Sequence, residues 1–94
     1  MTYKPKPIDT GSIVLPRSLE DLTEKLAEHV HDIWAERRIS EGWSYAPEHS
    51  SEEKVRPDLV KYDHLSESEK EYDRSTAIET LKAIIALGYK IEKE

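Results

Sequence analysis

The sequence lacks cysteine altogether and has only three glycines and no long apolar run. Without cysteine the chain cannot build a disulfide framework, a thiolate nucleophile, or a Cys-ligated zinc or iron–sulfur site. The glycines do not cluster, so a Gly-rich phosphate loop is excluded as well. No apolar stretch approaches the roughly 20 residues that span a bilayer, and residues 1–7 lack the apolar core of a secretory signal. We therefore expect a cytoplasmic protein that does not contact a membrane.

The sequence has an excess of acidic residues, which limits the classes of molecule that it can bind. Fourteen Lys and Arg residues stand against twenty Asp and Glu, which gives a net charge of −6. Such a charge repels the phosphate backbone of nucleic acids, so we expect no nucleic-acid partner. With 94 residues the chain forms one domain over residues 1–94. A domain of this size buries about 60–65% of its unfolded surface, and association with a second copy would enlarge its thin core.

The ends of the chain have an extended character. Proline alternates with lysine over residues 4–7, and each proline fixes φ and removes a donor, so this stretch predicts an extended arm. Residues 13–15 are apolar and are followed by Pro16, which indicates a short extended segment or an edge strand on the core. Near the other end, residues 89–91 alternate in the manner of a short strand.

Apolar residues recur at helical spacing after residue 18, which predicts a first helix over about residues 18–39. Ser18 and Asp21 resemble a capping arrangement at its start, and Gly42 lies beyond its end. The apolar stripe consists of Leu19, Leu22, Leu26, Val30, Ile33 and Trp34.

Two further segments complete the predicted fold. Residues 40–65 contain prolines, a glycine and serines that exclude a long helix, but also aromatic and aliphatic residues, so we expect an ordered loop. Ser66 and Glu69 form an S-x-x-E capping box that opens a second helix over about residues 66–88, which Gly88 ends. The expected fold is mainly α, with two long antiparallel helices, a long ordered loop and short β or extended flanks.

A series of short motifs, spread from about residue 5 to residue 91, resembles the ryanodine-receptor repeat, or RyR domain. The motifs are Pro7-Ile8-Asp9-Thr10, Ile13-Val14-Leu15-Pro16, Leu26-Ala27-Glu28, His31-Asp32-Ile33-Trp34, Gly42-Trp43-Ser44-Tyr45, Pro57-Asp58-Leu59-Val60 with Tyr62, Glu79-Thr80-Leu81-Lys82, and Leu87-Gly88-Tyr89. His29 and Arg56 depart from the family pattern, which often has Asn and His there, and these departures imply an altered polar pocket.

The resemblance implies a single copy of the stand-alone bacterial type, with two antiparallel helices and a small β element. It implies no established catalytic activity. In the calcium-release channels such repeats occur as tandem pairs on the cytoplasmic periphery, so the resemblance also implies that a single copy could form a homodimer.

Five residues are the candidate ligand-binding group. Aromatic rings can stack a planar base, and an arginine beside them can pair with phosphate or carboxylate. A core role for the two tryptophans and a solvated helix end for the arginine are the alternatives that remain open. The five are Trp34, Arg38, Trp43, Tyr45 and Tyr62.

We predict no metal site, no cofactor and no catalytic residue. His29 and His31 form the only close histidine pair, and two residues two apart on a helix project about 200° apart, so they cannot share one ion. His31 is better explained as bonded to a backbone carbonyl, or as holding the loop over Trp34. No nucleophile and base stand at a spacing that supports an enzyme.

Two functions remain. The first is a non-enzymatic ligand-recognition or regulatory module for a nucleotide-like planar anion. The alternative is a structural protein-interaction module that homodimerises or docks on a larger assembly.

Overall fold

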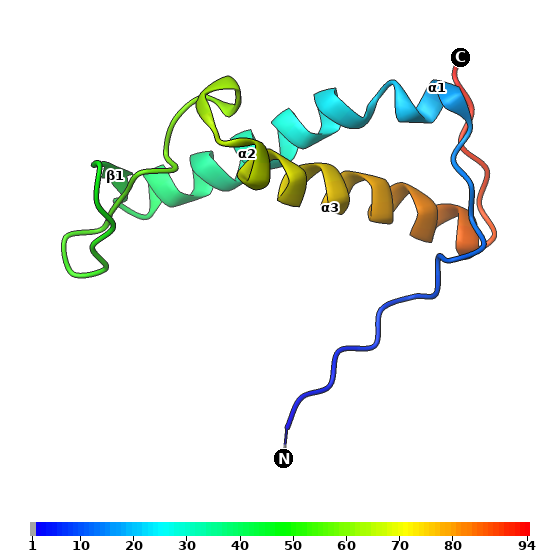
Figure 1. The fold of residues 1–94 in the computed structure, drawn as a ribbon, viewed down its shortest axis with the longest axis horizontal. Helices are drawn as coiled ribbons and strands as arrows, with labels where there is room; N and C mark the ends of the chain where they lie inside the picture. The colour runs from blue at the N-terminus through cyan, green and yellow to red at the C-terminus, as the bar shows by residue number, and fades with distance from the viewer. Residues whose placement is uncertain (1) are drawn as a thin grey trace.

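The computed structural model describes residues 2–94 and shows a mainly helical chain, as the sequence predicts (Figure 1). From the short helix α1 the chain continues into the long helix α2, reaches two short strands at the far end of the molecule, and returns in the long helix α3 (Figure 1). The elements in chain order are α1 Arg17–Glu20, α2 Thr23–Ser40, β1 Ser44–Tyr45, β2 Val55–Arg56, the 3₁₀ helix η1 Tyr62–His64, and α3 Glu67–Ala86.

The helix predicted over residues 18–39 is interrupted near its start. A turn at residues 21–22 separates α1 from α2. At this turn the amide of Leu22 donates to the carbonyl of Leu19 at 3.1 Å. This bond spans three residues instead of the four of an α-helix, so the chain is locally tightened and the helix axis is broken.

The capping arrangement predicted from Ser18 and Asp21 is wrong. Ser18 lies inside α1, and Pro16 occupies the N-cap position with no side-chain hydrogen bond. Proline tolerates this place because the first amides of a helix have no intrahelical partner.

Both predicted ends of the second helix are confirmed. The Ser66 hydroxyl accepts from the Glu69 amide at 3.3 Å, and the Glu69 carboxylate accepts from the Ser66 amide at 3.2 Å, which is a complete capping box. At the other end Gly88 has φ +98°, its amide donates to Ile85, and the amide of Tyr89 donates to Ile84. This pair of bonds is a Schellman motif, which needs a left-handed residue where Gly88 stands.

The segment predicted as a loop over residues 40–65 contains regular structure. β1 and β2 pair in parallel, with Ser44 opposite Val55 and Tyr45 opposite Arg56. Residues 46–54 connect them, which is short for a parallel pair. Ser50 bridges back to Val55 in the antiparallel sense, so the connecting residues fold onto β2 themselves.

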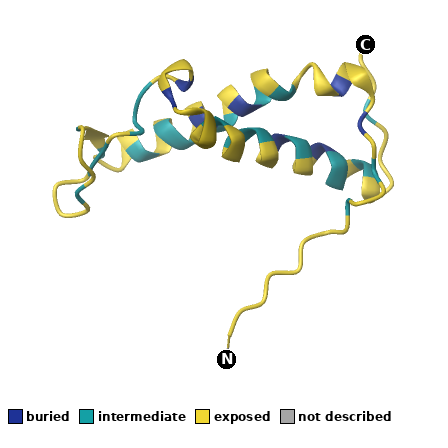
Figure 2. Ribbon diagram, in the orientation of Figure 1, coloured by how far each residue is buried: buried dark blue, intermediate teal, exposed yellow. Residues whose placement is uncertain are grey.

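The expected strands at the flanks are not found. Residues 13–15 and 89–91 have no strand pairing in the structure. Residues 2–9 are exposed and extended, as the alternation of proline and lysine predicts, and Figure 2 shows this arm in yellow leading away from the helices.

The core is thin and consists of two small clusters, one where the segment at Leu15 and α1 meet α3 and one where α2 meets η1. Figure 2 shows buried positions as isolated dark-blue patches on helices that are otherwise partly exposed. One cluster joins Leu15, Leu19 and Leu81, and a second joins Ala27, Tyr62 and Leu65.

Candidate functional site

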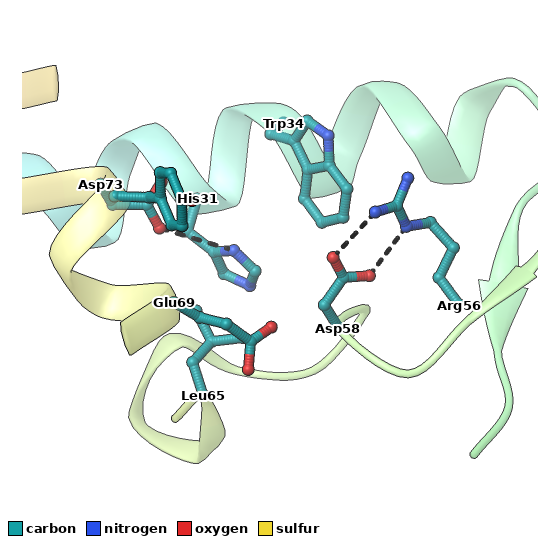
Figure 3. Close-up of a pocket in the computed structure, with 8 residues that line it drawn as sticks. His31, Trp34, Arg56, Asp58, Leu65, Glu69 and Asp73 are labelled. Atoms are coloured by element: carbon teal, nitrogen blue, oxygen red, sulfur yellow. Dashed lines mark hydrogen bonds and ion pairs between the residues drawn. The ribbon is translucent and has the colours of Figure 1, made fainter. Parts of the chain in front are cut away.

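A cavity of about 260 Å³ opens between α2, the segment after β2, and the first turns of α3 (Figure 3). Its wall combines an indole, an arginine, a histidine and three carboxylates. The lining residues are His31, Trp34, Arg56, Asp58, Leu65, Glu69, Tyr72 and Asp73.

His31 fixes the loop to α2. Its side chain is buried, and its Nε2 lies 2.7 Å from the carbonyl oxygen of Val60. A carbonyl only accepts, so Nε2 carries the proton and donates. The predicted bond from His31 to a backbone carbonyl is thereby confirmed. The ring also lies beside Trp34, with centroids 5.6 Å apart.

Arg56 and Asp58 form a two-bonded ion pair at one wall of the cavity (Figure 3). Nε of Arg56 donates to Oδ1 of Asp58 at 2.9 Å, and Nη2 donates to Oδ2 at 3.1 Å. The planar guanidinium thus presents two parallel donors to one carboxylate, the strongest geometry for this pair.

Two arginines lie over both tryptophans. The guanidinium carbon of Arg56 is 5.1 Å from the ring centroid of Trp34 and 5.7 Å from that of Trp43. For Arg38 the corresponding distances are 6.0 Å and 5.4 Å. These distances place both cations within cation–π range of each indole.

The predicted aromatic cluster is wrong as a direct assembly of rings. Within residues 2–94 the ring pairs join His31 to Trp34, His31 to Tyr62, and Trp43 to His49, and none joins the two tryptophans. The two tryptophans are linked through arginine instead, because the guanidinium groups of Arg38 and Arg56 each lie within 6.0 Å of both indole centroids.

The end of α2 explains why Trp43 lies beside Arg38. Gly42 has φ +95°, its amide donates to Ile39, and the amide of Trp43 donates to the carbonyl of Arg38 at 3.0 Å. This Schellman motif turns the chain back on the last helical turn, so the indole of Trp43 lies beside the side chain of Arg38, five positions earlier.

The two predicted tyrosines lie elsewhere. Tyr45 is 56% exposed in β1 and does not line the cavity. Tyr62 is only 4% exposed, packs with Ala27 and Leu65, and donates its hydroxyl to the Glu24 carboxylate at 3.1 Å. Of the five candidates, therefore, Trp34 lines the cavity, and Arg38 and Trp43 adjoin it through Arg56.

Carboxylates on α3 make the opposite wall acidic. Asp73 lies 4.0 Å from Nδ1 of His31, and its side chain is 21% exposed. Burial raises the pKa of Asp73, although the nearby His31 acts in the opposite direction. Glu69 faces the same cavity while it serves the capping box.

Sequence reasoning missed Asp58 and Asp73, and it marked Arg56 only as a departure from a family pattern. The sequence did carry a signal for the pairing of Arg56 with Asp58, because side chains two residues apart in an extended segment point to the same side. For Asp73 the signal is its spacing of four from Glu69, which puts both carboxylates on one face of a helix.

Two other classes of site are a metal centre and a membrane span. Among the residues described, 2–94, there is no group of three or more His, Asp or Glu side chains arranged to hold a metal ion. Over the same residues, no helix has both the length and the apolar character needed to cross a membrane.

Comparison with models of protein families identifies a family for this chain. The model of the RyR domain family matches residues 3–93, nearly the whole chain.

Proposed function

Because the chain belongs to the RyR domain family, we propose that it is a non-enzymatic ligand-recognition or regulatory module built on an antiparallel helix pair with an ordered loop. The ligand we propose is a nucleotide-like planar anion. The observation that carries this proposal is the cavity that combines an indole wall at Trp34 with a guanidinium at Arg56.

The size of the cavity limits what enters it. Ligand pockets for drug-sized molecules measure roughly 300–1,000 Å³, and this one is about 260 Å³. A single planar ring system fits that space better than a complete nucleotide. We place the ring against Trp34 and the charged part of the ligand outside, on the side of Arg38 and Arg56.

Charge supports this orientation. The α3 wall carries Glu69 and Asp73, which repel phosphate but accept hydrogen bonds from amino groups of a base. The opposite wall carries Arg56, and Arg38 lies beside it outside the cavity; guanidinium groups pair with phosphate or carboxylate. A ligand with a donor-rich ring and a negative tail therefore matches both walls.

The test is a titration of tryptophan fluorescence in two single-tryptophan variants. Trp43→Phe retains only Trp34 in the cavity wall, and Trp34→Phe retains only Trp43 outside it. We expect adenine or guanine nucleotides, cyclic nucleotides or dinucleotides to give a saturable change in Trp43→Phe and a smaller one in Trp34→Phe. A parallel thermal shift should show stabilisation of about 2.7 kcal/mol at 100 times Kd.

The two variants control each other because each loses one indole and keeps an aromatic ring. Equal responses in both variants would place the ligand away from Trp34. Silence across the whole panel, without a thermal shift, would contradict the nucleotide proposal.

A second candidate is self-association or docking through exposed apolar side chains. Val14, Leu87 and Tyr89 are 86%, 63% and 69% exposed, so their apolar side chains are available to a partner. We propose homodimerisation through these side chains as the alternative function.

A further inference from the structure

We propose that Asp58 is a built-in occupant of an anion subsite at Arg56, and that a phosphoryl group of the ligand displaces it. This inference rests on the proposed function and names how the charged part of the ligand is recognised. It makes Asp58 a specificity-determining residue, because a weakly charged ligand cannot compete with the carboxylate already in place.

The geometry of the pair resembles that of a bound ligand. The carboxylate of Asp58 meets Nε and Nη2 of Arg56 at 2.9 and 3.1 Å, the arrangement in which arginine also holds a phosphate. The side chains remain 27% and 23% exposed, and both line the cavity, so an incoming anion can reach the guanidinium.

Arg56 is held in place independently of Asp58. It belongs to β2, where its carbonyl accepts from the amide of Ala46 at 3.2 Å, and its guanidinium lies over Trp34 and Trp43. Asp58 lies outside any helix or strand, and within residues 2–94 its side chain makes hydrogen bonds only to Arg56. The arginine is therefore fixed, while the carboxylate can swing away.

A second cation adds to the field at this position. The guanidinium of Arg38 approaches the same two indoles, and its carboxylate partner, Glu41, is 3.5 Å away at the end of α2. When Asp58 moves away from Arg56, the two guanidinium groups of Arg38 and Arg56 have only the exposed Glu41 as a close carboxylate partner. A doubly charged phosphoryl group suits such a site better than the single charge of a carboxylate.

The experiment compares Asp58→Asn with Asp73→Asn by isothermal titration. Each variant removes one negative charge from the same cavity, but only the first releases Arg56. The probes are a nucleoside monophosphate, its parent nucleoside and inorganic phosphate. We expect Asp58→Asn to bind the monophosphate at least about tenfold more tightly than wild type, and by a clearly larger factor than Asp73→Asn does.

Two further variants secure the interpretation. Adding Arg56→Lys to Asp58→Asn should abolish the gain, because lysine lacks the planar pair of donors. If Asp58→Asn does not fold, as judged by its thermal unfolding, Asp58→Ala releases the same arginine and replaces it in the comparison.

The outcomes separate this inference from the proposed function. Wild type that binds nucleotides, with equal gains in the two charge variants, overturns the subsite and leaves the function standing. Binding of inorganic phosphate by Asp58→Asn, with no response to the nucleoside in any variant, supports the subsite and contradicts the planar ligand. No binding of any phosphate-bearing probe by Asp58→Asn overturns the subsite.

Discussion

Tyr62 was predicted as an aromatic ligand-binding residue, but the structure places its ring in the core. Its ring packs against Ala27 and Leu65, and its hydroxyl reaches Glu24. Burial raises the pKa of Tyr62, and the hydrogen bond to Glu24 raises it further. The residue joins η1 to α2, which places it in the core.

Tyr62→Phe removes only this hydroxyl. We expect a loss of about 1 kcal/mol in the free energy of unfolding, the net value of one such hydrogen bond. Urea denaturation followed by circular dichroism measures the loss. Tyr45→Phe is the control, because Tyr45 is 56% exposed, and its change should stay within about 0.5 kcal/mol.

Glu24 gives the fold a defined response to acid. Arg74 donates to Glu24 and also to Glu67 and Glu71, and the bond from Arg74 holds the pKa of Glu24 below its ordinary value of 4.5. A lowered pKa stabilises the fold above 4.5, and this contribution is lost as the pH falls through the lowered value. The advantage of wild type over Glu24→Gln in thermal unfolding should therefore shrink as the pH drops below about 4.5.

Asp73 is the control for Glu24, because its pKa is shifted in the opposite direction. Its pKa is raised from 3.8 by burial, so its ionised form disfavours folding at neutral pH. Asp73→Asn should gain stability relative to wild type at pH 7, and the gain should disappear in acid. A gain for Glu24→Gln at pH 7 would contradict the role assigned to Arg74.

At the scale of single residues, the sequence could identify His31 and Trp34 but not the pairing of Arg56 with Asp58. His31 follows from local reasoning, since a histidine on a helix beside a loop needs a partner for its N–H. The position of Arg56 over two indoles depends on how β2 is laid against α2, and no local pattern encodes that contact.

At the scale of elements, the two long helices end in the same way. Gly42 and Gly88 both have positive φ and both precede an aromatic residue whose amide closes the motif. These ends could be predicted because a helix stop depends on a few adjacent residues. The break at residues 21–22 could not, since neither glycine nor proline marks it.

Gly88→Ala tests the cost of such an end. No heavy atom lies within 4 Å of the added methyl group, so the cost comes from the backbone alone. At φ +98° an alanine should lower the free energy of unfolding by about 1–2 kcal/mol. Chemical denaturation measures it, and the comparison is Gly11→Ala, which requires no left-handed conformation and whose methyl group meets only Oδ1 of the Asp9 side chain, at 3.3 Å. Equal effects at both positions would contradict the argument from φ.

At the scale of the whole molecule, the shape explains both the thin core and the exposed apolar surface. The chain extends over 44 × 41 × 23 Å, and the helices form a single layer (Figure 1). The family resemblance implied a small β element, but the place of the β1–β2 pair could not be predicted because strands of two residues leave no alternating pattern to detect.

Sedimentation at micromolar concentration tests the proposed homodimer. We expect a species of twice 10.9 kDa, and Leu87→Gln should shift it toward the single chain by removing exposed apolar area. Ile39→Gln, which changes a similarly exposed residue at the end of α2, is the matched control. Sedimentation of wild type at 10.9 kDa alone would dispose of the dimer.

The single return of the chain from α2 to α3 also has a kinetic consequence. Once the two helices have formed, one closure of the segment over residues 41–66 brings together Glu24 and Arg74, and His31 and Val60. Helical proteins with such simple topology fold fast, because little loop entropy is lost before native contacts compensate for it. The step that limits refolding should then be the docking of this one segment, and substitutions within it should slow refolding more than substitutions in the arm at residues 2–9.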